Sequence, residues 1–134
     1  MTAIGPRAGA ASSNTVTLAR DGDRTIAFVA DADGRQVITF DVDSASSIAS
    51  TPLDAAPSGV VALPNGTIAA LGGDDARVHV LGVSRVDQPL IELGARVVAA
   101  EPVSAVVSAD GARLLVVSRW GHALTSLPID DAGG

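Results

Sequence analysis

The sequence contains no cysteine and no tyrosine. Without cysteine the chain forms no disulfide bond and offers no thiolate to a metal, so cysteine usage indicates neither an oxidising nor a reducing compartment. The stretch from Met1 to Asn14 also lacks the apolar core of a signal peptide. Two locations therefore stay open: the cytoplasm, or the periplasm or cell exterior if a signal peptide has been removed.

Large aromatic rings and cationic side chains are scarce as well. Aromatic residues make up 2% of the chain and hydrophobic residues 47%, so the core is packed from aliphatic side chains around Phe28, Phe40 and Trp120. No apolar run approaches the roughly 18 residues of a membrane-spanning helix. The formal net charge is −6 and the cationic residues form no cluster, so phosphate backbones would repel the chain. We therefore expect no nucleic-acid binding and no membrane insertion.

What the sequence does contain is a repeat, marked by three turn signals. Asp21-Gly22, Asn65-Gly66 and Asp110-Gly111 stand 44 and 45 residues apart. Each pair is typical of a type I′ β-hairpin turn, because both of its residues tolerate positive φ. Segments of alternating polarity, which favour β-strands, lie on both sides of each pair.

Four short strands can be assigned to each of the first two copies and three to the last. The predicted strands are 15–19, 25–30, 36–42, 48–53, 59–63, 67–71, 77–83, 90–93, 103–108, 113–118 and 123–129. Pro57 and Pro102 precede the first strand of copies two and three, an edge position at which proline is tolerated. Helical repeats would need an apolar spacing near 3.6 residues, and an immunoglobulin-like sandwich needs no fixed turn period.

Repeated four-stranded units of this length are the signature of β-propeller blades. The sequence therefore predicts an all-β fold of tandem four-stranded antiparallel blades. The ring is incomplete in one chain, since closed propellers typically have about 4 to 8 blades. We assign residues 1–14 to a flexible N-terminal segment, 15–130 to one segment of three blades (15–56, 57–101 and 102–130), and 131–134 to a tail.

One motif resembles a known family. Phe28-Val29-Ala30-Asp31 stands where bacterial surface-layer-type propellers carry their Tyr-Val-Thr-Asn (YVTN) repeat motif, and the corresponding segments are Ala70-Leu71-Gly72-Gly73 and Val116-Val117-Ser118-Arg119. Only the first copy is close to the family motif. The resemblance implies a propeller, but such propellers include binding scaffolds, lactonases and cytochrome-fused proteins, so it fixes no activity.

The loops between the second and third strands of each copy are the expected binding surface. In the geometry of that family these loops open on one face, and loops on a rigid scaffold often carry binding residues. Arg119, Trp120 and His122 in the third loop, with Arg35 and Arg77 in the others, form the candidate surface for a protein partner. An exposed Trp beside an Arg is typical of an interface hot spot. The alternative is that Trp120 covers the blade edge as part of the core.

Four aspartates in the same loops are a candidate metal site. Asp31, Asp33, Asp74 and Asp75 could offer carboxylate oxygens to calcium. Aspartates in tight turns also serve purely local hydrogen bonding, and the further ligands of an EF-hand are missing. His79 lies within a predicted strand, where it either faces the central channel or is a satisfied structural residue.

No sequence motif for catalysis stands out. There is no nucleophile elbow, phosphate-binding loop or dinucleotide fingerprint. We therefore expect a non-catalytic propeller module for binding or scaffolding, without a cofactor, completed by self-association or by a partner chain. The alternative is a lactonase-like hydrolase, with or without a divalent metal, whose site is assembled on the loop rim.

Overall fold

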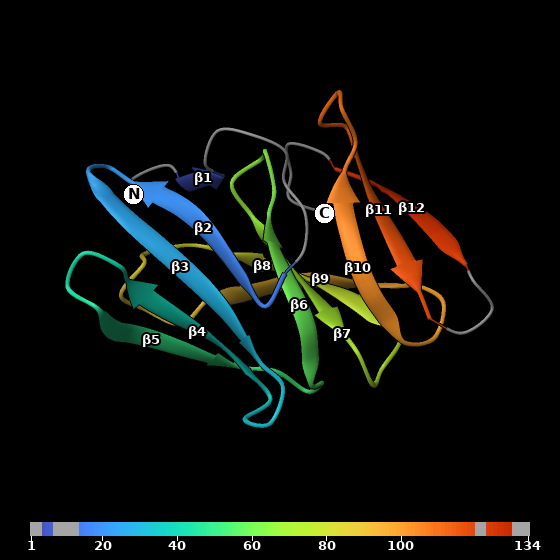
Figure 1. Cartoon of the computed structure of the whole chain (residues 1–134), viewed down its shortest axis with the longest axis horizontal. Helices are drawn as coiled ribbons and strands as arrows, with labels where there is room; N and C mark the ends of the chain where they lie inside the picture. Colours follow the sequence, from blue (N-terminus) through green and yellow to red (C-terminus); the bar gives the residue numbers. More distant parts are fainter. Residues whose placement is uncertain (1–3, 7–13, 120–122, 130–134) are drawn as a thin grey trace.

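The chain folds into β-strands alone. The computed structural model describes residues 4–6, 14–119 and 123–129, and within these residues there is no helix, hence none that could span a membrane. The strands form three antiparallel sheets, one per predicted copy, that follow one another in sequence order across the molecule in Figure 1. The prediction of tandem antiparallel blades in an unclosed ring is confirmed.

The three sheets are blades 1, 2 and 3. Blade 1 has the strand order β1-β2-β3-β4-β5 and consists of β1 (Ile4–Pro6), β2 (Val16–Asp21), β3 (Arg24–Asp31), β4 (Gln36–Asp41) and β5 (Ser46–Pro52). Blade 2 consists of β6 (Pro57–Ala62), β7 (Ile68–Gly72), β8 (Arg77–Gly82) and β9 (Ile91–Val97). Blade 3 consists of β10 (Pro102–Val107), β11 (Arg113–Ser118) and β12 (Leu124–Pro128).

Two strands differ from the expected pattern. β9 continues to Val97, beyond the short strand expected at 90–93. Within the stretch expected to be flexible, β1 pairs antiparallel with β2, its Gly5 lying opposite Arg20. β1 thus adds a fifth strand to blade 1, beside the first strand of the repeat.

The hairpin turns lie where the sequence places them, but they are not of type I′. Gly22, Gly66 and Gly111 have φ values of 61°, 87° and 73°, whereas no neighbouring Asp or Asn in these turns has positive φ. In the first hairpin Asp21 pairs with Arg24, which leaves Gly22 as the first of two loop residues. Positive φ at the first loop residue alone is the type II′ pattern. The Asp-Gly signal locates a turn without fixing which loop position the glycine takes.

Two faces of each blade must be distinguished. We call the face that turns toward the next blade along the chain the front face, and the opposite face the rear face. Because side chains alternate along a strand, the ladder pairs divide each blade cleanly between the two. Phe28 and Ile26 on the front face of blade 1 pack against Val60 and Ile68 on the rear face of blade 2 in one buried cluster.

A second buried cluster joins blades 2 and 3. Val61 and Leu71 on the front face of blade 2 pack there with Leu114 and Val116 on the rear face of blade 3. All four are at most 2% exposed. The core therefore lies between the blades, and each blade is held by its neighbour.

The strand register also corrects the alignment of the three motif copies. Phe28 lies on a front face, as do Ala69 and Leu115, whereas Ala70 belongs to the cluster on the rear face of blade 2. The ladder therefore aligns Phe28 with Ala69 and not with Ala70, a shift of one residue. The ladder to the third strand agrees: Asp31 pairs with Gln36 as Gly72 pairs with Arg77, and these residues lie three positions after Phe28 and Ala69.

Candidate functional site

The loops between second and third strands lie along one end of the blades, here called the loop rim. The loops 32–35 and 73–76 both lie at the lower edge of Figure 1, next to the links that join successive blades. Arg35 and Ala76 occupy the same position in their loops and have φ values of 52° and 55°. The two loops thus end in the same left-handed backbone conformation, one residue before the third strand of each blade.

An ion pair joins the rim loops of blades 1 and 2. Nη1 of Arg35 lies 2.8 Å from Oδ2 of Asp74, and both side chains are half-exposed. Oδ1 of Asp74 accepts a hydrogen bond of 2.9 Å from the backbone N–H of Ala56, and Arg35 also donates to the carbonyl oxygen of Asp54. The Ala56 N–H and the Arg35 guanidinium together lower the pKa of Asp74. Two residues proposed for different sites therefore bind each other.

The remaining predicted binding residues are spread along the rim. Arg77 is exposed at the start of β8, and its backbone N–H donates to Oδ1 of Asp75 over 3.2 Å. Arg119 is exposed after β11, and its backbone N–H donates to the carbonyl oxygen of Glu101 over 2.9 Å. Trp120 and His122 lie outside the described residues.

Protein donors already occupy most of the predicted metal ligands. Asp31 accepts hydrogen bonds from the Gly34 backbone N–H at 3.0 Å and from Nε2 of Gln36 at 2.8 Å, which lower its pKa, the Gln36 contact most. Asp33 is exposed. Within residues 4–6, 14–119 and 123–129, no three Asp, Glu or His side chains are placed to hold a metal ion together. A bound calcium ion would have to displace these donors.

Asp75 takes part in a polar cluster around the buried His79 that the sequence did not reveal. His79 is 4% exposed; its Nε2 lies 2.8 Å from Oδ2 of Asp75, and its Nδ1 lies 2.9 Å from Oε1 of Glu92. His79 thus has a hydrogen-bond partner at each ring nitrogen, as the structural interpretation of this residue expected. Glu92 could not be paired with it from the sequence, because the β8–β9 ladder slips between Val80 and Leu81.

A polar cleft of about 330 Å³ lies at the end of the blades opposite the loop rim. Asp21 and Arg24 line it from blade 1, and residues 83–87 line it from the loop after β8. Arg24 pairs with Asp21 at 3.0 Å and with Asp41 at 3.5 Å, and the hydrogen bond to Asp21 is the main cause of its raised pKa. The charged groups of this cleft are therefore largely neutralised by one another.

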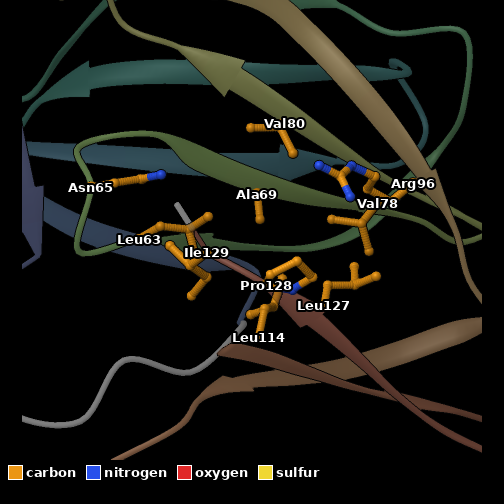
Figure 2. A pocket seen from close by; sticks show the side chains of 10 residues that line it. All are labelled: Leu63, Asn65, Ala69, Val78, Val80, Arg96, Leu114, Leu127, Pro128 and Ile129. Carbon is orange, nitrogen blue, oxygen red and sulfur yellow. The ribbon is translucent and has the colours of Figure 1, made fainter. Parts of the chain in front are cut away.

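An apolar crevice separates the outer parts of blades 2 and 3. Figure 2 shows the side chains of Leu63, Val78, Leu114 and Leu127 pointing toward one another, with Arg96 at the margin. The space between them is about 20 Å³. One water molecule already needs roughly 10–15 Å³. The crevice is therefore a packing gap between two blades and has no room for a ligand.

Comparison with known proteins adds no identity to this geometry. The sequence matches no protein-family model and no curated protein. The likeness to surface-layer-type propellers stays a prediction from the motif at Phe28. The assignment of three blades is based on the strand topology of the structure.

Proposed function

We propose that this chain is a non-catalytic β-propeller module that binds and positions other proteins. Further blades, from a second copy or from a partner chain, complete its ring. A protein partner then docks on the loop rim. The observation that carries this proposal is the rear face of blade 1, which is apolar and has no further blade packed against it within the described part of the chain.

The rear face of blade 1 has the composition of a buried interface. Aligning the strand ladders of the two blades gives each of six residues on this face an equivalent in blade 2. Val16, Leu18, Ala27, Val29, Ile38 and Phe40 are equivalent to Val60, Ala62, Ile68, Ala70, His79 and Leu81, in that order. The blade 2 residues are all at most 4% exposed, because blade 1 covers them. In blade 1 all six are apolar: Val16 is 43% exposed, Ala27 is 7% exposed, and the other four are partly buried.

Exposed apolar sheet faces of this kind mark interaction surfaces. Covering the face with another blade would bury it as blade 1 buries the rear face of blade 2. Leaving it bare would expose a flat apolar sheet to any chain in solution. Completion of the ring is the arrangement that repeats the packing already present twice in this chain.

The loop rim supports the binding part of the proposal. Arg35, Arg77 and Arg119 stand along it on three successive blades, and arginine is enriched where proteins bind one another. Backbone hydrogen bonds from Ala56 and Arg77 hold Asp74 and Asp75 in place between them. A rim fixed in this way offers a preorganised surface with little ordering cost.

The absence of native cysteine allows a direct test of ring completion. Val16→Cys places one thiol on the rear face of blade 1, and Gln88→Cys places one in the exposed loop between β8 and β9 as a matched control. Labelling with a maleimide is followed for the purified protein and for the protein in an extract of its source. We expect the thiol at position 16 to react about tenfold more slowly than that at position 88, as protected groups do. Equal rates in both settings would show that nothing covers the face.

A further inference from the structure

We infer that the chain which completes the ring is a second copy of this one, packed head to tail. The front face of blade 3 of each copy covers the rear face of blade 1 of the other. This inference rests on the proposed ring completion and adds the identity of the partner.

The front face of blade 3 is even more exposed than the rear face of blade 1. When the strand ladders of blades 2 and 3 are aligned, Val106, Leu115, Val117 and Leu124 are equivalent to Val61, Ala69, Leu71 and Val78 of blade 2. The blade 2 residues are at most 1% exposed, because blade 3 covers them. Their equivalents Val106, Val117 and Leu124 are 38%, 43% and 64% exposed.

The two end faces are complementary in size. Between blades 2 and 3, the small Val61 and Ala69 of the front face pack with the larger Leu114 and Leu127 of the rear face. The ends of the chain show the same relation. The front face of blade 3 carries serine at two of its six positions, whereas the rear face of blade 1 carries Leu18, Ile38 and Phe40. A small front face would therefore meet a large rear face, as it does between blades 2 and 3.

The two faces also match in polarity. None of the twelve positions holds a charged residue; on blade 3 they are Ser104, Val106, Leu115, Val117, Leu124 and Ser126, and on blade 1 the six given above. The Arg113 guanidinium also lies on the front face of blade 3, where it donates to Oγ and to the carbonyl oxygen of Ser126. Arg113 is exposed at the start of β11, so its charge can stay in water at the margin of the contact while the apolar positions are buried.

The number of blades sets the number of copies. Closed propellers have about 4 to 8 blades, and one chain supplies three. Two copies give six blades, whereas three copies give nine, outside this range. A head-to-tail contact forms a ring when its rotation closes, and with two copies the same contact is used twice. The front face of blade 3 and the rear face of blade 1 are then both fully covered.

The test uses one substitution on each face. Val16→Lys and Val117→Glu change residues that are each 43% exposed, so in a single unassociated chain the new charge can stay in water. Light scattering coupled to size exclusion measures the mass at tens of micromolar protein. We expect twice 13.3 kDa for the native chain and 13.3 kDa for each variant alone. Val97→Lys, at a residue that is 72% exposed and on neither end face, is the control that keeps the doubled mass.

Mixing the two variants decides the arrangement. In a mixed pair one contact sets lysine against glutamate and the other contact is native, so the doubled mass returns. A mixture that stays at 13.3 kDa overturns the head-to-tail contact, as does a native chain that is a monomer throughout. If a charged variant fails to fold by circular dichroism, Val16→Thr and Val117→Thr replace it. These should raise the dimer dissociation constant about tenfold each, and an unchanged constant overturns the inference.

The two proposals can fail separately. A monomeric native chain whose thiol at position 16 is still protected in the extract would reject the second copy and keep ring completion by another protein. A monomeric chain with that thiol reactive in both settings would reject both.

Discussion

Oδ2 of Asp75 lies 2.8 Å from Nε2 of His79, so a carboxylate of the loop rim reaches the buried middle of β8. Gly72 makes room for this contact, because a Cβ built there would lie 1.9 Å from Oδ1 of Asp75. The side chain of Asp75 fills the space that any larger residue at position 72 would need. The rim loop therefore contacts β8 through Asp75 and His79, and this contact depends on the absence of a side chain at Gly72.

Gly72→Ala should destabilise blade 2. The added methyl group forces Asp75 away from His79, which leaves a buried ring nitrogen without its partner, and we expect a loss of roughly 1–3 kcal/mol in the free energy of unfolding. Urea unfolding followed by circular dichroism measures it. Gly94→Ala in β9 is the control: a Cβ there meets nothing within 4 Å, so the substitution should be neutral or stabilise by about 0.4–1 kcal/mol. Equal effects would show that the space at Gly72 does not hold Asp75 in place.

Acid should weaken the junction between blades 1 and 2 through Asp74. Its pKa in the folded protein is lowered by the Ala56 N–H and by Arg35, so its contribution to stability is complete above the ordinary value of 3.8 and is lost as the pH falls through the folded value. Asp74→Asn removes this dependence. Melting temperatures between pH 7 and pH 2 should therefore converge for the native protein and the variant below about pH 4.

Asp33→Asn is the matched control for this pH series. Asp33 occupies the position of Asp74 in the loop of blade 1 and is exposed. Its substitution should leave the pH profile of the native protein unchanged. A profile altered as strongly by Asp33→Asn as by Asp74→Asn would assign the effect to the overall charge.

Two buried threonines should respond differently to loss of their hydroxyl groups. Oγ1 of Thr39 is buried with no hydrogen-bond partner among the described residues, whereas Oγ1 of Thr51 accepts from the backbone N–H of Leu90 at 2.7 Å. Thr39→Val should change the free energy of unfolding by less than about 0.5 kcal/mol or raise it. Thr51→Val should lower it by about 1–3 kcal/mol, because the Leu90 N–H loses its acceptor. Chemical unfolding of both variants tests the pair.

Substituting each of the two phenylalanines in turn should distinguish an effect on folding from an effect on association. Phe28 is fully buried between blades 1 and 2, so Phe28→Ala should cost about 3–5 kcal/mol in the free energy of unfolding. Phe40 lies on the rear face of blade 1 and is only partly buried, so Phe40→Ala should cost about 1 kcal/mol in the isolated stack. In light scattering, Phe40→Ala should lower the fraction of protein at the doubled mass more than its small effect on the free energy of unfolding suggests. A Phe40→Ala variant that associates like the native chain would count against contact at this face.

The blades could be predicted because the turn signals and the alternating strands are local properties of the sequence. Gly66 and Gly111 take positive φ where the repeat places them, and the strands on both sides follow. Details set by contacts between strands could not be predicted. The slip after Val80 that brings Glu92 to His79 has no local signature, and the one-residue shift between the motif copies follows only from the strand ladders.

The same limit applies to the candidate site. The sequence placed Arg35 and Asp74 on one rim, since both follow the second strand of a blade. Their mutual ion pair depends on how closely neighbouring blades pack, which only the assembled fold determines.

The pairing of β1 with β2 decides how blade 1 can associate. Ile4, Gly5 and Pro6 lie opposite Asp21, Arg20 and Ala19, so the strand edge is already occupied along that half of β2. β1 therefore replaces β2 as the edge strand there. With three residues, of which Pro6 has no backbone N–H, β1 offers an incoming strand little to pair with. Growth by strand addition is disfavoured at this edge, while the apolar face beside it stays open to stacking.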